Sequence, residues 1–168
     1  MSTPAHRFAW AQSHEEWSQA AEFFARVIAA DPAYISHGEI QTGLSLDGKT
    51  WAPDLAQRFL NELGAYDDSR SLALARDGKG SITAAANVSW SVETPEVPFA
   101  TLQDMAVEPA LRSSGIGAAL MAFVEGEARA RGMRWLFLES GKNNARAHAF
   151  FERFGLHEVS HVFAKRFD

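Results

Sequence analysis

The sequence of 168 residues contains no cysteine. A chain without cysteine has no disulfide framework, no thiolate zinc site and no cysteine nucleophile. Apolar runs are also short, and none approaches the ~20 residues that a membrane-spanning helix needs. No segment resembles the hydrophobic region of a secretion signal. We therefore expect a cytoplasmic protein with no membrane partner and no metal.

Positive charge is scarce as well. The chain has 16 Lys and Arg residues against 21 Asp and Glu residues, which gives a formal net charge of −5. Because nucleic acid phosphates are bound by basic surfaces, we expect no nucleic acid partner. The acidic balance favours a cationic partner such as an amine. A net negative charge also keeps a protein soluble without any such partner, and composition does not distinguish these two roles.

The length fits one domain over residues 1–168, large enough to bury ~70% of its extended surface. Within it, a period of two residues predicts strands and a period of 3.6 predicts helices. The predicted strands are residues 6–12, 71–76, 81–92, 99–107, 135–138 and 158–167. The predicted helices are residues 13–31, 53–63, 114–131 and 144–154. Antiparallel hairpins come first and parallel crossovers follow, so this order predicts a mixed α/β sheet.

Several local signals support these bounds. Ser13 and Glu16 form a capping-box pattern at the start of the first helix, which Asp31-Pro32 ends. Residues 135–138, Trp-Leu-Phe-Leu, are continuously apolar, which predicts a strand buried on both faces. Residues 33–51 show no clean period.

The most informative segment connects the strand ending at Val107 to the helix that follows. It contains Arg112, Gly115 and Gly117 in the pattern Arg-x-x-Gly-x-Gly. Glycine lets a main chain approach a phosphate closely, and the free N–H groups at a helix start bind anions. The nucleotide-binding alternatives fit poorly, since the sequence has neither the Gly-x-x-x-x-Gly-Lys-Ser/Thr pattern nor a third glycine for a dinucleotide fold.

This segment resembles the signature of the GNAT N-acetyltransferase superfamily, Val-x-Pro-x-x-Arg-x-x-Gly-x-Gly. A second similarity lies downstream, where the family often has Leu-Glu-Val-x-x-x-Asn-x-x-Ala-x-x-Leu-Tyr-Glu-x-x-Gly-Phe. The two similarities cover about residues 102–157 in the right order. The residues that match are Val107, Pro109, Arg112, Gly115, Gly117, Leu120, Leu138, Glu139, Asn144, Ala147, Glu152 and Gly155.

The resemblance implies a central mixed sheet of about six to seven strands flanked by about four helices. It also implies acetyl-CoA as cosubstrate, with its pantetheine arm between two splayed strands. The main chain of Met105, Ala106 and Val107 would bond that arm, and Asn144 would bond the pantetheine or position it. The residues whose N–H groups would hold the pyrophosphate are Arg112, Ser113, Ser114, Gly115, Ile116, Gly117 and Ala118.

The implied activity is transfer of acetyl from acetyl-CoA to a primary amine by direct attack in a ternary complex. Many members of the family protonate the departing thiolate with a tyrosine, but this chain has Phe151 there. His148 is the nearest substitute by spacing. A general base must also take a proton from the acceptor, and Glu139 is the first candidate and Asp104 the second.

The acceptor is not determined by the sequence. In the family, the segment between the first two helices lines the acceptor pocket, and here it contains Tyr34, His37, Glu39 and Trp51. Phe151 also leaves open an alternative function, a catalytically weak sensor or partner subunit that binds acyl-CoA. Because only one strand follows the last helix, where many relatives have two, we expect a second copy to complete the sheet edge in a homodimer.

Overall fold

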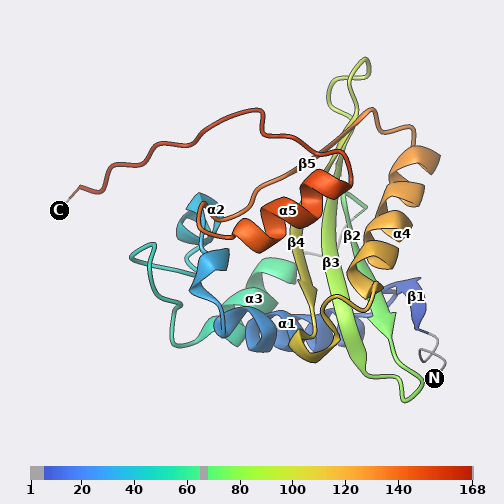
Figure 1. Cartoon of the computed structure of the whole chain (residues 1–168), viewed down its shortest axis with the longest axis horizontal. Coiled ribbons are helices and arrows are strands. Elements are labelled where there is room, and N and C mark those ends of the chain that lie inside the picture. The colour runs from blue at the N-terminus through green and yellow to red at the C-terminus, as the bar shows by residue number, and fades with distance from the viewer. Residues whose placement is uncertain (1–5, 65–67, 168) are drawn as a thin grey trace.

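A single mixed β-sheet organises the chain in the computed structural model, which describes residues 6–64 and 68–167 (Figure 1). Its strand order is β1-β2-β3-β4-β5; the first three pairs are antiparallel, and β4 and β5 are parallel. The strands are β1 (Arg7–Trp10), β2 (Arg70–Arg76), β3 (Ile82–Ser91), β4 (Phe99–Val107) and β5 (Trp135–Leu138). The mixed α/β sheet predicted from the order of elements is confirmed.

Helices cover both faces of this sheet. They are α1 (His14–Ala29), α2 (His37–Gln41), α3 (Leu55–Leu63), α4 (Ile116–Ala130) and α5 (Ala145–Arg153), with 3-10 turns at Pro32–Tyr34 and Pro109–Leu111. The predicted cap of α1 is present, because the Ser13 side chain accepts a hydrogen bond from the Glu16 amide. In the segment without a clean period, Ser36 and Glu39 form a second capping box that starts α2.

Two apolar cores lie on opposite faces of the sheet. On one face, α1 and α3 pack on side chains such as Leu72, Leu74 and Ala106. On the other face, α4 packs on Ala86 and Leu102, and the phenylalanines of α5 lie against the same core. Strands β2 and β3 are therefore buried on both sides, which explains their runs of leucine and alanine.

The structure corrects three expectations. The described residues form five strands and five α-helices, where six to seven strands and about four helices were expected. Residues 158–167, predicted as the last strand, are extended and exposed but pair with no strand of the described chain. Residues 135–138, predicted to be buried on both faces, alternate between exposed and partly buried, because β5 is an edge strand with only one covered face. No helix in the described ranges is long and apolar enough to cross a membrane.

Truncating Phe24 tests the core between α1 and α3. Its ring is 0% exposed and stacks on Phe59, with centroids 5.9 Å apart. We expect Phe24→Ala to lower the free energy of unfolding by about 3–5 kcal/mol, because it removes a ring from a packed site and leaves a cavity. Urea denaturation followed by circular dichroism measures this difference. Leu46→Ala, at a side chain that is 66% exposed, is the control and should change the midpoint little; equal effects of the two variants would contradict the described core.

Candidate active site

The defining feature of the site is a split between two parallel strands. Strands β4 and β5 pair only as far as Leu102 and Leu138, whereas β4 continues to Val107. Beyond Leu102, β4 is therefore bonded only to β3, and the peptide groups on its other side face away from any described strand. Such an edge can bond an extended ligand through the main chain, as another strand would.

A β-bulge in β4 lies at the same point. Val88 of β3 faces Leu102, but the preceding residue, Asn87, faces Asp104, so Gln103 is the extra residue. A bulge shifts the alternation of side chains along a strand. After the bulge, Met105 and Val107 pack on the α4 side of the sheet, and Ala106 packs on the α1 side. Asp104 is two residues before Ala106 and so lies on the α1 side as well.

The split opens into a narrow cleft that is partly continuous with solvent. Its walls come from β4, the end of β5, the start of α5 and the segment between α1 and α3. Phe151 also lines it. The site residues predicted from the sequence that line this cleft are Tyr34, Glu39, Trp51, Asp104, Met105, Glu139 and Asn144.

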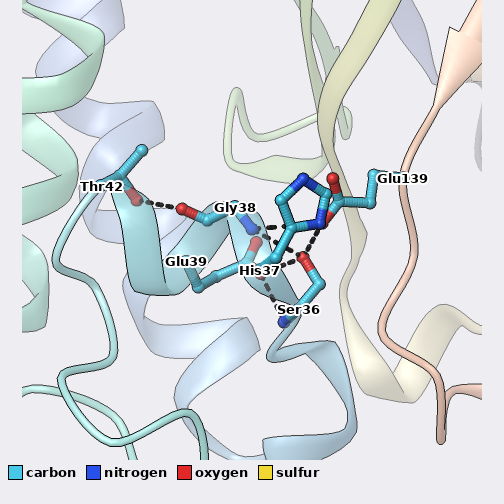
Figure 2. Close-up of polar contacts among 6 residues, drawn as sticks. All are labelled: Ser36, His37, Gly38, Glu39, Thr42 and Glu139. Atoms are coloured by element: carbon cyan, nitrogen blue, oxygen red, sulfur yellow. Dashed lines mark hydrogen bonds and ion pairs between the residues drawn. The ribbon is translucent and has the colours of Figure 1, made fainter. Parts of the chain in front are cut away.

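Glu139 is held by the start of α2 (Figure 2). Its Oε1 accepts hydrogen bonds from the Ser36 hydroxyl and the Gly38 amide, and lies 2.8 Å from His37 Nδ1. Ser36 Oγ also lies 2.6 Å from Glu39 Oε2, so one hydroxyl stands between two carboxylates and donates to one at a time. These contacts connect residues 34–39, which contain Tyr34 and Glu39, to Glu139 at the end of β5. His37 thus lies beside the cleft rather than in its lining.

Asp104 is partly buried and lines the cleft. The Asn87 side-chain amide donates to its Oδ2 at 3.1 Å. Burial raises the pKa of the Asp104 carboxyl to about 6, against the opposing effect of the Asn87 hydrogen bond. Burial likewise raises the pKa of Glu62 in α3 to about 7, and the nearby Asp104 contributes in the same direction. The carboxyl groups of Asp104 and Glu62, whose pKa values both lie close to neutrality, are therefore neighbours.

Asn144 and His148 hold the start of α5. Asn144 is 5% exposed, and its side-chain oxygen accepts a hydrogen bond from the Ala147 amide as the helix cap. His148 Nε2 lies 3.0 Å from the Gly141 carbonyl oxygen. The Gly141 position has no room for a side chain, since a Cβ there would lie 2.2 Å from the Ala33 carbonyl oxygen. The proposed acid role of His148 stays a prediction, since its ring is tied to the loop and does not line the cleft.

The turn before α4 has the geometry of an anion site. Ser113 and Gly115 have positive φ angles of 66° and 91°, and Gly115 is the N-cap of the helix. The amides of Ile116, Gly117 and Ala118 precede the first helical hydrogen bond, which the Ala119 amide donates to Gly115. Their N–H groups point out of the helix start, where the helix dipole also favours an anion.

Two amides of that turn are already used. The Arg112 amide donates to the Pro109 carbonyl, and the Ser114 amide donates to the Leu111 carbonyl. Of the set predicted from the sequence, residues 112–118, the amides of Arg112 and Ser114 are therefore not available to an anion, and the anion-binding role of the others stays a prediction. Within the described ranges, no group of three or more His, Asp or Glu side chains is placed to hold a metal ion.

The sequence matches the acetyltransferase (GNAT) family over residues 39–156, which is more than half of the chain. The chain belongs to the GNAT family. The ribosomal protein bS18-alanine N-acetyltransferase of Escherichia coli K12 is 30% identical over 112 residues, which are 67% of this chain and 64% of that protein. The chain thus spans less than two thirds of the length of this curated relative.

Solved structures agree with this GNAT assignment at the level of the fold. The aminoglycoside N-acetyltransferase AAC(6')-Iy, solved in complex with CoA, has a TM-score of 0.70 at 14% identity, over 98% of this chain and 96% of the other. The ribosomal-protein-alanine N-acetyltransferase of Brucella melitensis biovar Abortus 2308 has a TM-score of 0.64 at 15% identity, over 97% and 100% of the two chains. Identities this low show the fold alone.

Sequence reasoning missed three residues of this GNAT site. Asn87 interrupts the apolar run of β3, and that break in the pattern was a signal that its side chain has a buried partner. Glu62 lies one residue before the end of an amphipathic helix, where a charged residue is ordinary. Ser36 contacts Glu139 from 103 residues away, a contact that no local pattern reports.

The raised pKa of Asp104 makes a prediction about stability. The folded state holds the proton up to about pH 6, whereas the unfolded chain releases it near its ordinary value of 3.8. The free energy of unfolding should therefore fall as the pH rises through this window. We expect Asp104→Asn to raise stability at pH 7.5 by about 1–3 kcal/mol and to change it little below pH 4.

Urea midpoints measured from pH 4 to pH 8 check this expectation. Asp54→Asn is the matched control, because the Arg58 hydrogen bond lowers the pKa of that exposed carboxyl and its effect should have the opposite sign. A stability difference for Asp104→Asn that is independent of pH would contradict the raised pKa.

Proposed function

We propose that this protein is an N-acetyltransferase that moves the acetyl group of acetyl-CoA to a primary amine by direct attack in a ternary complex. The observation that carries the proposal is the split of β4 from β5, which begins beside Asp104 and leads along β4 to the anion site before α4. An elongated ligand with a diphosphate at one end and a thioester at the other fits such a site.

The diphosphate of the coenzyme would lie on the turn at residues 113–118. Amides at a helix start donate to phosphate oxygens, and the positive φ angles of Ser113 and Gly115 turn successive amides toward one side. The presence of CoA in the structure of the similar AAC(6')-Iy supports the same ligand here. The main chain of Met105, Ala106 and Val107 would bond the pantetheine arm along the open side of β4.

The amine attacks the thioester carbonyl carbon, and a β4 amide would donate to the oxyanion that develops there. One proton must leave the ammonium form of the acceptor before attack. Asp104 is the better base of the two candidates, since its carboxyl lies in the cleft with a pKa of about 6 and is mostly ionised at neutral pH. Glu139 already accepts from Ser36 and Gly38, so its first role would be to position α2.

A second proton leaves the nitrogen as the tetrahedral intermediate collapses, the carbon–sulfur bond breaks and the thiolate departs with the electron pair. Phe151 has no proton to give. Tyr34 is a phenol in the same cleft, and burial raises its pKa, while Arg112 acts in the opposite direction. Tyr34 would protonate the thiolate, in place of His148; a thiol with a pKa near 8.5 also leaves without this help.

The acceptor would be a cationic amine. Asp104, Glu39 and Glu139 line the cleft and Glu62 lies close to Asp104, so the site presents carboxyl groups to an incoming ammonium. The named relatives act on a ribosomal-protein alanine and on aminoglycosides, which are both amine acceptors. A panel that contains peptides with N-terminal alanine, aminoglycosides and polyamines tests the class. Since the chain has no cysteine, release of CoA thiol is measured without a background from the protein.

The glycine at the helix start gives a test of coenzyme binding. Gly115 has a φ angle of 91°, which costs an L side chain about 1–2 kcal/mol. The free turn of Gly115→Ala should relax out of this conformation and have to regain it on binding, which would weaken acetyl-CoA binding by about 5- to 30-fold. Isothermal titration calorimetry gives the dissociation constant. The matched control is Gly126→Ala in the same helix, where a Cβ meets nothing within 4 Å; it should leave binding unchanged. Native protein that does not bind acetyl-CoA would contradict the proposed function.

Measurements of activity distinguish the proposed roles of Asp104 and Glu139. The native enzyme should lose activity below about pH 6, and Asp104→Asn should lower kcat by about 10²–10⁴-fold and abolish that pH dependence. Glu139→Gln should mainly raise KM for the amine, because it loosens the segment that lines the acceptor side. The reverse pattern in steady-state kinetics would assign the base to Glu139.

A catalytically weak acyl-CoA sensor or partner subunit is the alternative that Phe151 leaves open. Tight acetyl-CoA binding with no thiol release across the amine panel would support it. Thiol release that is lost in Asp104→Asn would exclude it.

A further inference from the structure

Glu62 of α3 is a partly buried carboxyl group that the proposed mechanism does not use. Its Oε2 is enclosed by protein and has no hydrogen-bond partner among the described residues. Glu62 does not line the cleft, so it does not contact the acceptor there. A buried carboxylate oxygen without a donor is unfavourable, and a proton on the carboxyl group removes this penalty.

A second oxygen without a partner belongs to Asn87 of β3. The Asn87 side chain is 1% exposed, and its Oδ1 accepts no hydrogen bond from the described part of the chain. The Asn87 amide nitrogen donates to Asp104 Oδ2 at 3.1 Å. Because an ionised carboxylate only accepts hydrogen bonds, Asp104 determines which end of the amide faces it. The carbonyl end of Asn87 therefore still needs a donor.

Glu62 and Asn87 lie on the same side of the sheet. Asn87 pairs with Leu72 of β2, whose side chain belongs to the core beneath α1 and α3. Side chains that are opposite each other in paired strands point to the same face, so Asn87 points to the α3 side. Arg70 is two residues before Leu72, and its guanidinium donates to the main-chain carbonyl of Glu62 at 2.9 Å. This bond holds Glu62 at the start of β2, on the face that Asn87 and Asp104 share.

The charged groups around Glu62 come from three other elements. Burial raises the pKa of the Glu62 carboxyl to about 7; Asp104 of β4 and Glu39 of α2 add to this rise, and Arg70 of β2 opposes it. Burial also raises the pKa of Asp104, to about 6, and the Asn87 hydrogen bond acts in the opposite direction. Near neutral pH, Asp104 is therefore mostly ionised while Glu62 still retains much of its proton.

We propose that Glu62 is a positioning residue for Asp104: protonated Glu62 donates a hydrogen bond to Asn87 Oδ1, and the Asn87 amide donates in turn to the Asp104 carboxylate. A single proton on Glu62 then gives both unpartnered oxygens a partner. Hydrogen bonds in such a chain strengthen one another, so the Asp104 carboxylate is held in one orientation and in its charged form. This inference rests on the proposed function, in which Asp104 is the base.

Loss of the Glu62 proton breaks this chain of hydrogen bonds. Ionised Glu62 and Asn87 Oδ1 are both acceptors, and neither donates to the other. The Asn87 amide then loses the contact that fixes its carbonyl end, and its hydrogen bond to Asp104 weakens. The native enzyme should therefore become slower, relative to a variant that cannot ionise at this position, as the pH rises through about 7.

Two substitutions of Glu62 distinguish a hydrogen-bond donor from a charge. Glu62→Gln has an N–H donor at every pH, whereas Glu62→Leu has none. With a single amine substrate, whose own titration cancels in the ratio, kcat of the native enzyme and of Glu62→Gln should agree within about 2-fold near pH 6. At pH 8.5, Glu62→Gln should be faster than the native enzyme by about 3- to 10-fold.

Glu62→Leu should be slower than Glu62→Gln by about 3- to 10-fold at every pH, because it never donates to Asn87. KM for the amine should stay the same, since Glu62 does not line the cleft. Glu22→Gln, at an exposed carboxyl group of α1, is the matched control and should follow the native enzyme over the whole pH range. Equal kcat values for Glu62→Gln and Glu62→Leu, or a change confined to KM, would overturn the proposal.

Asn87→Ala tests the route from Glu62 to Asp104. In this background Glu62→Leu should have little further effect on kcat, because the connection between the two carboxyl groups is already lost. Effects of the two substitutions that simply add would show that Glu62 does not act through Asn87. Circular dichroism confirms that each variant is folded, and the comparison of Glu62→Gln with Glu62→Leu decides the question if Asn87→Ala is not.

The proton on Glu62 is also measured without any substrate. The folded state retains it up to about pH 7, whereas the unfolded chain releases it near the ordinary pKa of 4.5. The free energy of unfolding of the native protein should therefore fall, relative to that of Glu62→Gln, between about pH 4.5 and pH 7. Urea midpoints of the two proteins give this difference, and a difference independent of pH would overturn the proposal even in an active enzyme. Failure to acetylate any amine would instead contradict the proposed function, while the pH-dependent difference in stability would still support the hydrogen bonds.

Discussion

The separation of β4 from β5 is the constraint on which the rest of the site depends. The two parallel strands stay together while they pack on α4, and they part where Gln103 adds a residue to β4. The extra residue turns Asp104 toward Asn87 and the α1 side, and it leaves the next peptide groups of β4 without a strand beside them. A single irregularity thereby creates both the open edge for an extended ligand and a carboxyl group next to it.

The cleft depends on a second interaction, the tie between Glu139 and the start of α2. A helix of five residues has little stability of its own. Its capping box and the contacts of Ser36, His37 and Gly38 with Glu139 fix it to the end of β5. Through Glu139, the position of the cleft wall that contains Tyr34 and Glu39 depends on the end of β5.

The five observed strands, the long helices and the glycine-bearing turn before α4 could be predicted from the sequence because their signals are local. The capping box at Ser13 and the glycine pair after Arg112 each determine a boundary within a few residues. The bulge at Gln103, the contact between Ser36 and Glu139, and the pairing of Asn87 with Asp104 arise from residues far apart in the chain, so periodicity does not report them. The expectation that residues 135–138 are buried on both faces was wrong for another reason. A continuous apolar run is typical of a buried central strand, but here it belongs to an edge strand whose rings Trp135 and Phe137 stay exposed.

Residues 158–167 and strand β5 both show that strand-forming side chains alone do not produce a paired strand. Strand propensity describes how well side chains fit a pleated surface, and it becomes structure only when a neighbouring strand accepts the hydrogen bonds. In this chain the strand-forming segment and the unpaired edge are both present but are not brought together.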